Sequence, residues 1–356
     1  MNRRQFLATT LAASLAAPAR HSRSADLPPA TAGWRAYEIT TRVTVPDGPG
    51  SARLWLPLAQ TAGGYQSALA LRWHGTGHNE LASDALYGAP ILRTQWEEAD
   101  PAPRQLEAVQ TVAVRDRAGA SPLLPLTRAE RQLWTAPTES VPLDGAVLAT
   151  AARITAGKDG PRERLRAIYD WVVDHTHRDP DVPGCGRGEV AALLARDQPG
   201  GKCADINGLM VGLARAAGFP ARDVYGVRVG RSGWFPSLGA SGDVTKAQHC
   251  RAEVFLDGEG WLPVDPADVA KVVLTEKLPP GSPEVRALRE RLFGAWEMNW
   301  VGYNSATDLT LPGGEDLRPD LAFLMYPCAF TAGGECPCLD PARFRYEITA
   351  REVSPG

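Results

Sequence analysis

The sequence predicts an α+β protein, in which a domain of helices and antiparallel strands follows an all-β, sandwich-like N-terminal domain. Apolar residues alternate with polar ones in short segments between residues 34 and 116, which is typical of strands. In residues 164–173 and 203–217 they recur instead at helical spacing. Strand patterns return after the second helix, and this order favours the α+β class. A chain of 356 residues is long enough for two such domains.

Residues 1–25 are predicted to be an export signal. Arg3 and Arg4 precede a short apolar, Ala-rich run that ends at Ala17, and a run of this length cannot anchor a protein in a bilayer. Paired arginines in this position are similar to the twin-arginine type of signal, which exports proteins that have already folded. We therefore expect a periplasmic or secreted mature chain, in a compartment where disulfide bonds are permitted.

Residues 26–116 are predicted to form a β-sandwich-like domain. Short strands separated by Gly, Pro and Asp turns are typical of that architecture. The strand patterns lie at residues 34–45, 52–58, 69–74, 90–97 and 107–115.

Residues 117–145 are predicted to be a linker, because they contain four prolines, at positions 122, 125, 137 and 142. The domain that follows, residues 146–275, is predicted to carry the chemistry. Its helical patterns lie at residues 164–173, 190–194 and 203–217. Gly218 and Pro220 are expected to end the last of these helices. Its strand patterns lie at residues 222–229, 250–256 and 261–265.

Residues 276–356 are predicted to be a C-terminal extension with one helix at 282–296, an irregular aromatic-rich segment and a final strand at 344–353. Residues 346–351 nearly repeat the pattern of residues 37–42. The similarity indicates two amphipathic strands, and we expect the last strand to pair with the N-terminal sheet.

Charge and hydropathy exclude two classes of partner. The formal charge of the chain is −3 and no run of Lys or Arg stands out, so nucleic-acid binding through phosphate neutralisation is not expected. No window approaches the ~20 apolar residues of a membrane span, so the mature chain should have no transmembrane segment.

The strongest chemical signal is Cys203, which follows a Gly-Gly-Lys loop at the start of the clearest predicted helix. A sulfur there lies near unpaired backbone N–H groups and the positive end of the helix dipole. Both favour the thiolate, which is the nucleophilic form of cysteine. A buried structural cysteine is the alternative for such a position.

A predicted hairpin downstream supplies the other two groups of a thiol-based active site. If residues 257–259 form a three-residue turn, Asp265 lies opposite Arg251, and His249 becomes its diagonal neighbour on the same face. A four-residue turn would place His249 and Asp265 on opposite faces. Cysteine as nucleophile, histidine as base and aspartate as the group that orients the base are the three parts of thiol catalysis.

These motifs resemble the bacterial transglutaminase-like superfamily over about residues 160–270. The resemblance rests on Gly-Gly-Lys-Cys203-Ala-Asp-Ile-Asn, on Gly-Phe-Pro-Ala-Arg222, and on the segment from His249 to Asp265-Pro. It implies a papain-like fold, in which a helix carrying Cys203 packs on an antiparallel sheet carrying His249 and Asp265. One departure is Cys250-Arg251 after the histidine, where the family commonly has an aromatic residue or Ala.

Other candidate residues carry weaker signals. The backbone N–H of Cys203 and the side chain of Gln198 are candidate donors to an oxyanion. His175 and His177 with Cys185 lack a fourth ligand at motif spacing, so no metal site is predicted. No metal or organic cofactor is expected.

Cys328 and Cys338 are predicted to form a structural disulfide bond. If residues 331–335 form a loop between two strands, Phe330 lies opposite Cys336 and Cys328 lies opposite Cys338.

Together these features predict an exported cysteine enzyme, periplasmic or secreted, that acts on peptide or carboxamide bonds of a protein or peptide substrate. The cell envelope is one expected source of that substrate. Its acyl-thioester would pass to water, as in a peptidase or amidase, or to an amine, as in an acyl transferase. Hydrolysis is favoured because water is present at ~55 M and nothing in the sequence excludes it. The alternative is a non-catalytic cell-envelope peptide- or glycan-binding protein that retains the fold.

Export can be tested directly. We predict that the mature protein begins between Arg20 and Leu27, and that replacing Arg3 and Arg4 by lysine leaves the precursor in the cytoplasm. N-terminal sequencing of exported material checks the first prediction, and an intact Met1 there would contradict it.

Overall fold

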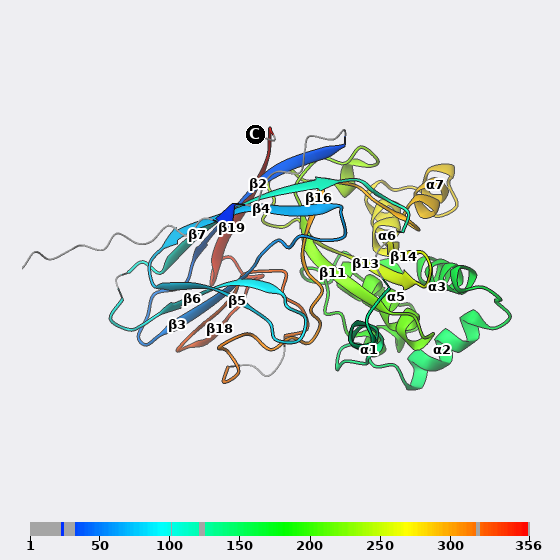
Figure 1. The fold of residues 1–356 in the computed structure, drawn as a ribbon, viewed down its shortest axis with the longest axis horizontal. Helices are drawn as coiled ribbons and strands as arrows, with labels where there is room; N and C mark the ends of the chain where they lie inside the picture. Colours follow the sequence, from blue (N-terminus) through cyan, green and yellow to red (C-terminus); the bar gives the residue numbers. More distant parts are fainter. Residues whose placement is uncertain (1–22, 25–32, 101, 121–124, 318–320, 355–356) are drawn as a thin grey trace, which may run out of the picture.

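The computed structural model describes residues 23–24, 33–100, 102–120, 125–317 and 321–354. The predicted export signal lies outside these residues except for positions 23–24. The described chain forms a strand-rich part and a part in which helices surround a smaller sheet, side by side (Figure 1). No helix in the described ranges is both long and apolar enough to cross a membrane.

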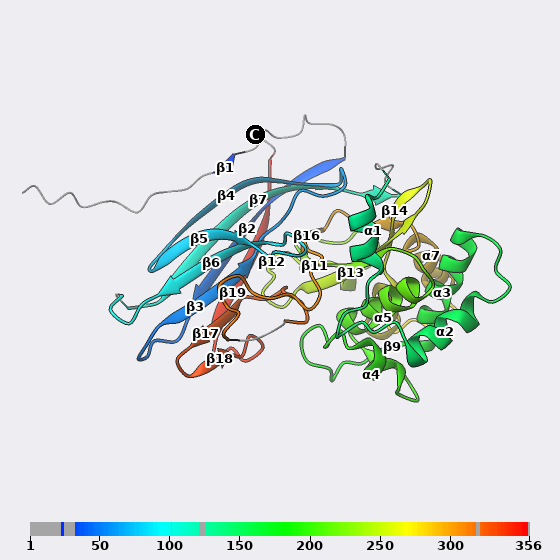
Figure 2. The same cartoon turned by 60° about the horizontal axis from the view of Figure 1, so that its bottom comes forward.

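The strand-rich part contains two sheets (Figure 2). Along β2 buried side chains alternate with more exposed ones, so that one face of the strand points into the core. Apolar side chains of both sheets meet in that core, among them Val43, Leu54, Leu92 and Leu106. The first sheet has the order β1 (Arg23–Ser24), β4 (Gln66–Gly75), β7 (Gln105–Arg115), β2 (Trp34–Thr44), β19 (Arg345–Val353), β12 (Gly242–Asp243). The second has the order β18 (Gly334–Cys336), β17 (Cys328–Thr331), β3 (Ala52–Pro57), β6 (Pro90–Trp96), β5 (His78–Ser83).

The end of the chain completes this sandwich. β19 pairs antiparallel with β2, from Arg345 opposite Thr44 to Val353 opposite Ala36. The expected pairing of the last strand with the N-terminal sheet is therefore confirmed. Residues 276–356 are not a separate extension, however, because β17, β18 and β19 belong to the sandwich, whereas β16 (Trp300–Asn304) joins the sheet of the helical part.

The helical part contains the four-stranded antiparallel sheet β14 (Gly260–Val264), β13 (Gln248–Leu256), β11 (Ala221–Arg228) and β16. Helix α5 (Cys203–Ala216) packs on β13 and β11 and is buried along almost its whole length. Gly218, with a φ of +89°, ends the helix as predicted, and the N–H of Phe219 returns to the carbonyl of Ala214. The surrounding helices are α2 (Gly145–Thr155), α3 (Pro161–His175), α4 (Val190–Leu194), α6 (Pro266–Thr275) and α7 (Pro283–Arg291). The short elements are β8 (Arg117–Ala118), β9 (His177–Arg178), β10 (Gly200–Gly201), η1 (Pro236–Leu238) and β15 (Ala295–Trp296).

The predicted linker contains a helix, α1 (Arg128–Thr135). Thr127 and Glu130 form a reciprocal capping box at its start, which stabilises a helix that the prolines on either side had obscured. The indole of Trp134 on this helix lies edge-on to Trp261, with ring centroids 6.2 Å apart. The segment is therefore packed against the hairpin of the helical part.

A buried ion pair joins the two parts of the molecule. Arg117, directly after the sandwich strand β7, contacts Glu253 on β13, and their side chains are 5% and 2% exposed. Arg222 on β11 also contacts Glu253, with 2.6 Å between Nη2 and Oε1. Burial alone would raise the pKa of Glu253, but Arg222 and Arg117 together hold it below its usual value.

Replacing Glu253 by glutamine should therefore destabilise the protein strongly. The variant leaves Arg117 buried without its counter-charge, and breaking a buried pair in this way costs about 3–5 kcal/mol. Glu347→Gln is the control, because that side chain is 55% exposed and its pair with Arg42 lies at the surface; it should cost less than about 1 kcal/mol. Denaturant unfolding followed by circular dichroism measures both, and equal losses would contradict the prediction.

Candidate active site

Cys203 is the first residue of α5, and a network centred on Asp205 fixes its backbone. Asp205 Oδ2 accepts a hydrogen bond of 2.9 Å from the N–H of Lys202, while Oδ1 accepts from the N–H groups of Arg187 and Gly188. The loop that precedes Arg187 passes so close that a Cβ on Gly186 would lie 1.9 Å from Asp205 Oδ2. A glycine is required there, and the Asp205 contacts hold the loop against the start of the helix.

His249 lies on β13 of the predicted hairpin, and Asp265 directly follows β14 as the N-cap residue of α6. Ala252 pairs with Val264 and Leu256 with Gly260, which leaves residues 257–259 as a three-residue turn and confirms the predicted register. The contact follows from it: His249 Nε2 lies 2.7 Å from Asp265 Oδ2. Both side chains are buried, and Asp265 is 0% exposed.

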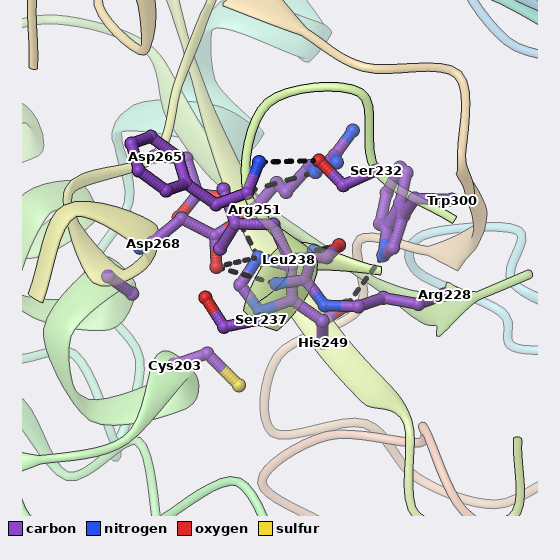
Figure 3. Close-up of polar contacts among 12 residues, drawn as sticks. Cys203, Arg228, Ser232, Ser237, Leu238, His249, Arg251, Asp265, Asp268 and Trp300 are labelled. Carbon is purple, nitrogen blue, oxygen red and sulfur yellow. Dashed lines mark hydrogen bonds and ion pairs between the residues drawn. The ribbon is translucent and has the colours of Figure 1, made fainter. Parts of the chain in front are cut away.

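Several further side chains hold this pair, and the sequence analysis did not identify them (Figure 3). Asn207 Nδ2, one turn along α5 from Cys203, donates to Asp265 Oδ1 at 3.2 Å and to the carbonyl of Cys250 at 2.8 Å. Asp268 Oδ1 lies 3.4 Å from His249 Nε2 and 2.5 Å from Arg228 Nη2. The spacing Asp265-Pro-Ala-Asp268 was a usable signal, because an Asp before Pro and an acid three residues later mark a helix start.

His249, Asp265 and Asp268 are the one group in the described residues with ligand atoms close enough to hold a metal ion. The negative charges of Asp265 and Asp268 are already compensated by arginine side chains. Arg228 contacts Asp268, and Arg251 Nε lies 3.8 Å from Asp265 Oδ2. A divalent cation placed there would meet two buried guanidinium groups, so the donor set fits an electrostatic network better than a metal site.

The surroundings of Cys203 favour its thiolate. Hydrogen bonds from the thiols of Cys185 and Cys250 lower the pKa of Cys203 well below its usual value, and His249 adds to this effect, although burial opposes it. Burial and Arg228 lower the pKa of His249, but Asp268 and Asp265 outweigh them, so that this pKa is raised. The two shifts together favour a thiolate beside an imidazolium.

The orientation of the imidazole is set by its neighbours. Nε2 faces the two carboxylates, so Nδ1 is the ring nitrogen left for the Cys203 sulfur. Trp300 Nε1 donates to the carbonyl of His249 at 2.8 Å and holds the backbone below the ring. Figure 3 shows that the Cys203 sulfur points away from helix α5, on the side where His249 lies.

A cavity of about 560 Å³ opens beside Cys203. Cys185 and Lys202 line it, and the carbonyl of Cys185 lies 4.0 Å from the Cys203 sulfur. Tyr326 and Tyr346 line its other side. Cys203 and His249 do not line the cavity themselves, but the residues that precede them, Lys202 and Gln248, do.

The structure does not bring Gln198 to Cys203. Gln198 is exposed and lines a different depression, together with His175 and His177. Its position follows from the parallel pairing of β10 with β9, which places Pro199 against His177. The two histidines line that depression, whereas Cys185 lines the cavity near Cys203.

The register predicted for Cys328 and Cys338 is wrong. Ala329 pairs with Cys336 and Thr331 with Gly334, so the turn has two residues and the strands are shifted by one relative to the expected pairing. A shift of one residue changes which side chains face each other. The structure accordingly contains no disulfide bond between Cys328 and Cys338.

Comparison with known proteins gives a family match and a relative that covers most of the chain. A family model described as "Transglutaminase-like superfamily" matches residues 148–266. A protein of Haemophilus influenzae (strain ATCC 51907 / DSM 11121 / KW20 / Rd), described as uncharacterized, is 34% identical over 346 residues. The match covers 89% of this chain and 91% of that protein.

One solved structure shares the fold over most of the chain. A crystal structure from Cytophaga hutchinsonii, described as "a Putative Cysteine Protease", aligns with a TM-score of 0.56 over 91% of this chain and 92% of its own, at 13% identity. The periplasmic domain of TgpA from Pseudomonas aeruginosa aligns with a TM-score of 0.35 over 68% of this chain and 90% of its own, at 16% identity. The predicted fold class, an α+β core with an N-terminal β domain, is confirmed.

The lowered pKa of Cys203 predicts how this thiol reacts with iodoacetamide. Because its pKa lies well below the usual value, its alkylation rate should stay nearly constant between about pH 6 and 8. The raised pKa values of Cys185 and Cys250 should confine their alkylation to alkaline pH. Mass spectrometry of peptides from samples quenched at intervals measures each rate.

Cys185→Ala removes a thiol donor and should raise the pKa of Cys203, so that the rate falls as pH drops through neutrality. Cys185→Ser keeps a hydroxyl donor at the same place and should stay closer to the wild type. A Cys203 rate that rises steeply near pH ~8.5 in the wild type would contradict the assignment.

Proposed function

The chain belongs to the transglutaminase-like superfamily, whose members are typically cysteine-based enzymes, and on that premise we propose that it hydrolyses peptide or carboxamide bonds through an acyl-thioester on Cys203. The observation that carries the proposal is the buried His249–Asp265 contact of 2.7 Å beside a cysteine with a lowered pKa. Nucleophile, base and orienting group are thus available in one place.

The proposed reaction has two steps. In the first, the Cys203 thiolate attacks the carbonyl carbon of the substrate, and the imidazolium of His249 gives its proton to the departing nitrogen as the C–N bond breaks. In the second, His249 takes a proton from water, whose oxygen attacks the thioester, and the C–S bond breaks to release a carboxylic acid and the thiolate. Asp265 is a positioning residue, which keeps Nε2 occupied and Nδ1 directed at the reacting atoms.

The negative oxygen formed in each step needs a hydrogen-bond donor. Cys203 occupies the first position of α5, where a backbone N–H has no acceptor within its own helix. This N–H also lies at the positive end of the helix dipole. It is therefore the donor that we assign to the oxyanion.

Hydrolysis and transfer to an amine differ only in the second step. The cavity beside Cys203 has room for water, because its volume exceeds that of one water molecule many times over. We propose water as the usual acceptor for this reason. Incubating the enzyme with a peptide amide and a primary amine, and analysing the products by mass spectrometry, tests the choice; a dominant amine adduct would assign a transferase instead.

We also propose that the protein is exported from the cytoplasm. The twin-arginine pattern supports export, and a peptide of the cell envelope is the substrate that an exported enzyme would meet.

The three residues should differ in the damage that their loss causes. Cys203→Ala should abolish acyl-enzyme formation, because no other group supplies the sulfur. His249→Ala should come next, since the base is lost and the thiolate loses its partner. Asp265→Ala should retain the most activity, with a loss of roughly 10²–10⁴ in rate. Trapping with a peptidyl electrophile and steady-state kinetics on a fluorogenic peptide measure the order.

Matched controls separate chemistry from folding. His78→Ala and Asp257→Asn change exposed side chains and should leave the rate unchanged. Asp265→Asn should move the acidic-to-neutral transition of His249 to lower pH, because Asp265 raises the pKa of that imidazole. Turnover by Cys203→Ala combined with none by Cys185→Ala would identify a different nucleophile, and no turnover with any peptide would favour a binding protein.

A further inference from the structure

The cavity beside Cys203 has an unusual balance of charge. Arg178, Lys202, Lys246 and Lys271 line it, whereas no Asp or Glu of the described chain does. The whole chain has 41 acidic and 38 basic residues, so this concentration of cations is not a property of the protein in general. In the described ranges these four side chains have no carboxylate within ion-pair distance, in contrast to Arg228 at the same cavity, which is paired with Asp268.

The cations are close enough to affect one another. Burial, Arg228 and Arg178 all lower the pKa of Lys271 on α6, to about 8, and the attraction of Asp268 only partly offsets them. A half-buried lysine held near other positive charges is destabilised in its charged form. An anion bound between Lys271 and Arg178 would relieve this repulsion.

The opposite wall of the cavity is largely apolar. It is formed by the C-terminal segment, where Tyr326, Leu339, Phe344 and Tyr346 line the space. This wall is held close to the basic one, because Val244 donates to the carbonyl of Ile348 on β19 and Gly242 pairs with Ala350. A ligand that fits both walls combines a negative group with apolar surface.

The position of the cations relates them to the chemistry. Lys202 directly precedes Cys203, and Cys185, which lines the cavity, has its carbonyl 4.0 Å from the Cys203 sulfur. A group bound in the cavity therefore lies next to the bond that Cys203 would attack.

We propose that this cavity is a specificity site for a peptide carboxylate close to the bond that is cleaved, with Lys271 and Arg178 as its main partners. Only the cleavage of the neighbouring bond rests on the proposed function; the binding of the carboxylate does not depend on catalysis. The carboxylate belongs either to an acidic side chain or to the end of a peptide, and the two sources can be told apart.

Binding to the Cys203→Ala protein tests the site without turnover. Four fluorescein-labelled hexapeptides serve as probes: a Glu-rich and a Gln-rich peptide with amidated ends, a Lys-rich amidated peptide, and the Gln-rich peptide with a free C-terminal carboxylate. Fluorescence anisotropy should give at least one carboxylate-bearing peptide an affinity about 10-fold above the amidated Gln-rich one, since a single desolvated ion pair supplies such a factor. Added salt should reduce the difference.

Variants assign the preference to the cavity. Lys271→Met and Arg178→Gln should each bring the affinity for the carboxylate peptide close to that for the amidated Gln-rich peptide. Lys158→Met is the control, because Lys158 is an exposed lysine that pairs with Glu163 on the helical surface, and it should change nothing. Thermal unfolding confirms that each variant is folded. If Lys271→Met does not fold, Arg178→Gln alone tests whether the cavity causes the preference, because Arg178 lies on a different element.

The results separate the two proposals. Equal binding of all four peptides, or a preference that survives in both cavity variants, overturns the specificity site. A preference that both variants remove supports the site even if the wild-type protein cleaves none of the peptides, in which case only the proposed function fails. If cleavage occurs, Lys271→Met should lower kcat/KM for the carboxylate peptide about 10-fold more than for the amidated Gln-rich peptide, because only the first peptide loses a binding partner.

Discussion

The candidate site depends on the burial of Asp265. A carboxylate that is fully removed from water is costly unless other groups compensate its charge and hydrogen bonds. Here His249 and Asn207 bond to it, the N–H of Asp268 donates to it at 3.1 Å, and Arg251 lies nearby. These groups come from α5, α6 and β13, so the compensation exists only when helix, hairpin and sheet are all assembled. The contacts that position the His249 imidazole are thus the same contacts that compensate the buried charge of Asp265.

The two parts of the molecule contribute differently to the site. The helical part supplies the proposed reacting groups on packed elements, and such placement restricts their movement. The sandwich supplies the other wall of the cavity through the segment that leads into β19. This division explains why the end of the chain returns to pair with β2 after β16 has joined the helical part. Arg117 and Glu253 tie the two parts together, and the guanidinium group of Arg117 also lies over the rings of Tyr65 and Trp296.

The features that the sequence predicted are those set by local spacing. A three-residue turn fixes which residues of a hairpin are opposite, so the proximity of His249 and Asp265 could be inferred from the chain alone. The turn near Cys336 has two residues instead, and the same reasoning with a longer turn gave the wrong partner for Cys328. Arg228 and Asn207 could not be predicted, because their contacts depend on which strands neighbour β13 and on how α5 lies across them. Gln198 was placed by sequence distance from Cys203, whereas the pairing of β10 with β9 directs it to another face.

The cations of the cavity connect substrate binding with the state of the nucleophile. Burial and Arg228 lower the pKa of Lys271, and the charge on Cys203 acts in the opposite direction. Because an interaction between two groups is mutual, Lys271 also stabilises the thiolate. A bound carboxylate would repel that thiolate and draw on the same positive charges. Because Arg178, Lys202 and Lys246 also line the cavity, positive charge remains when one cation is engaged by the substrate. The several cations of the cavity would therefore allow the proposed enzyme to bind an anionic substrate while its nucleophile stays charged.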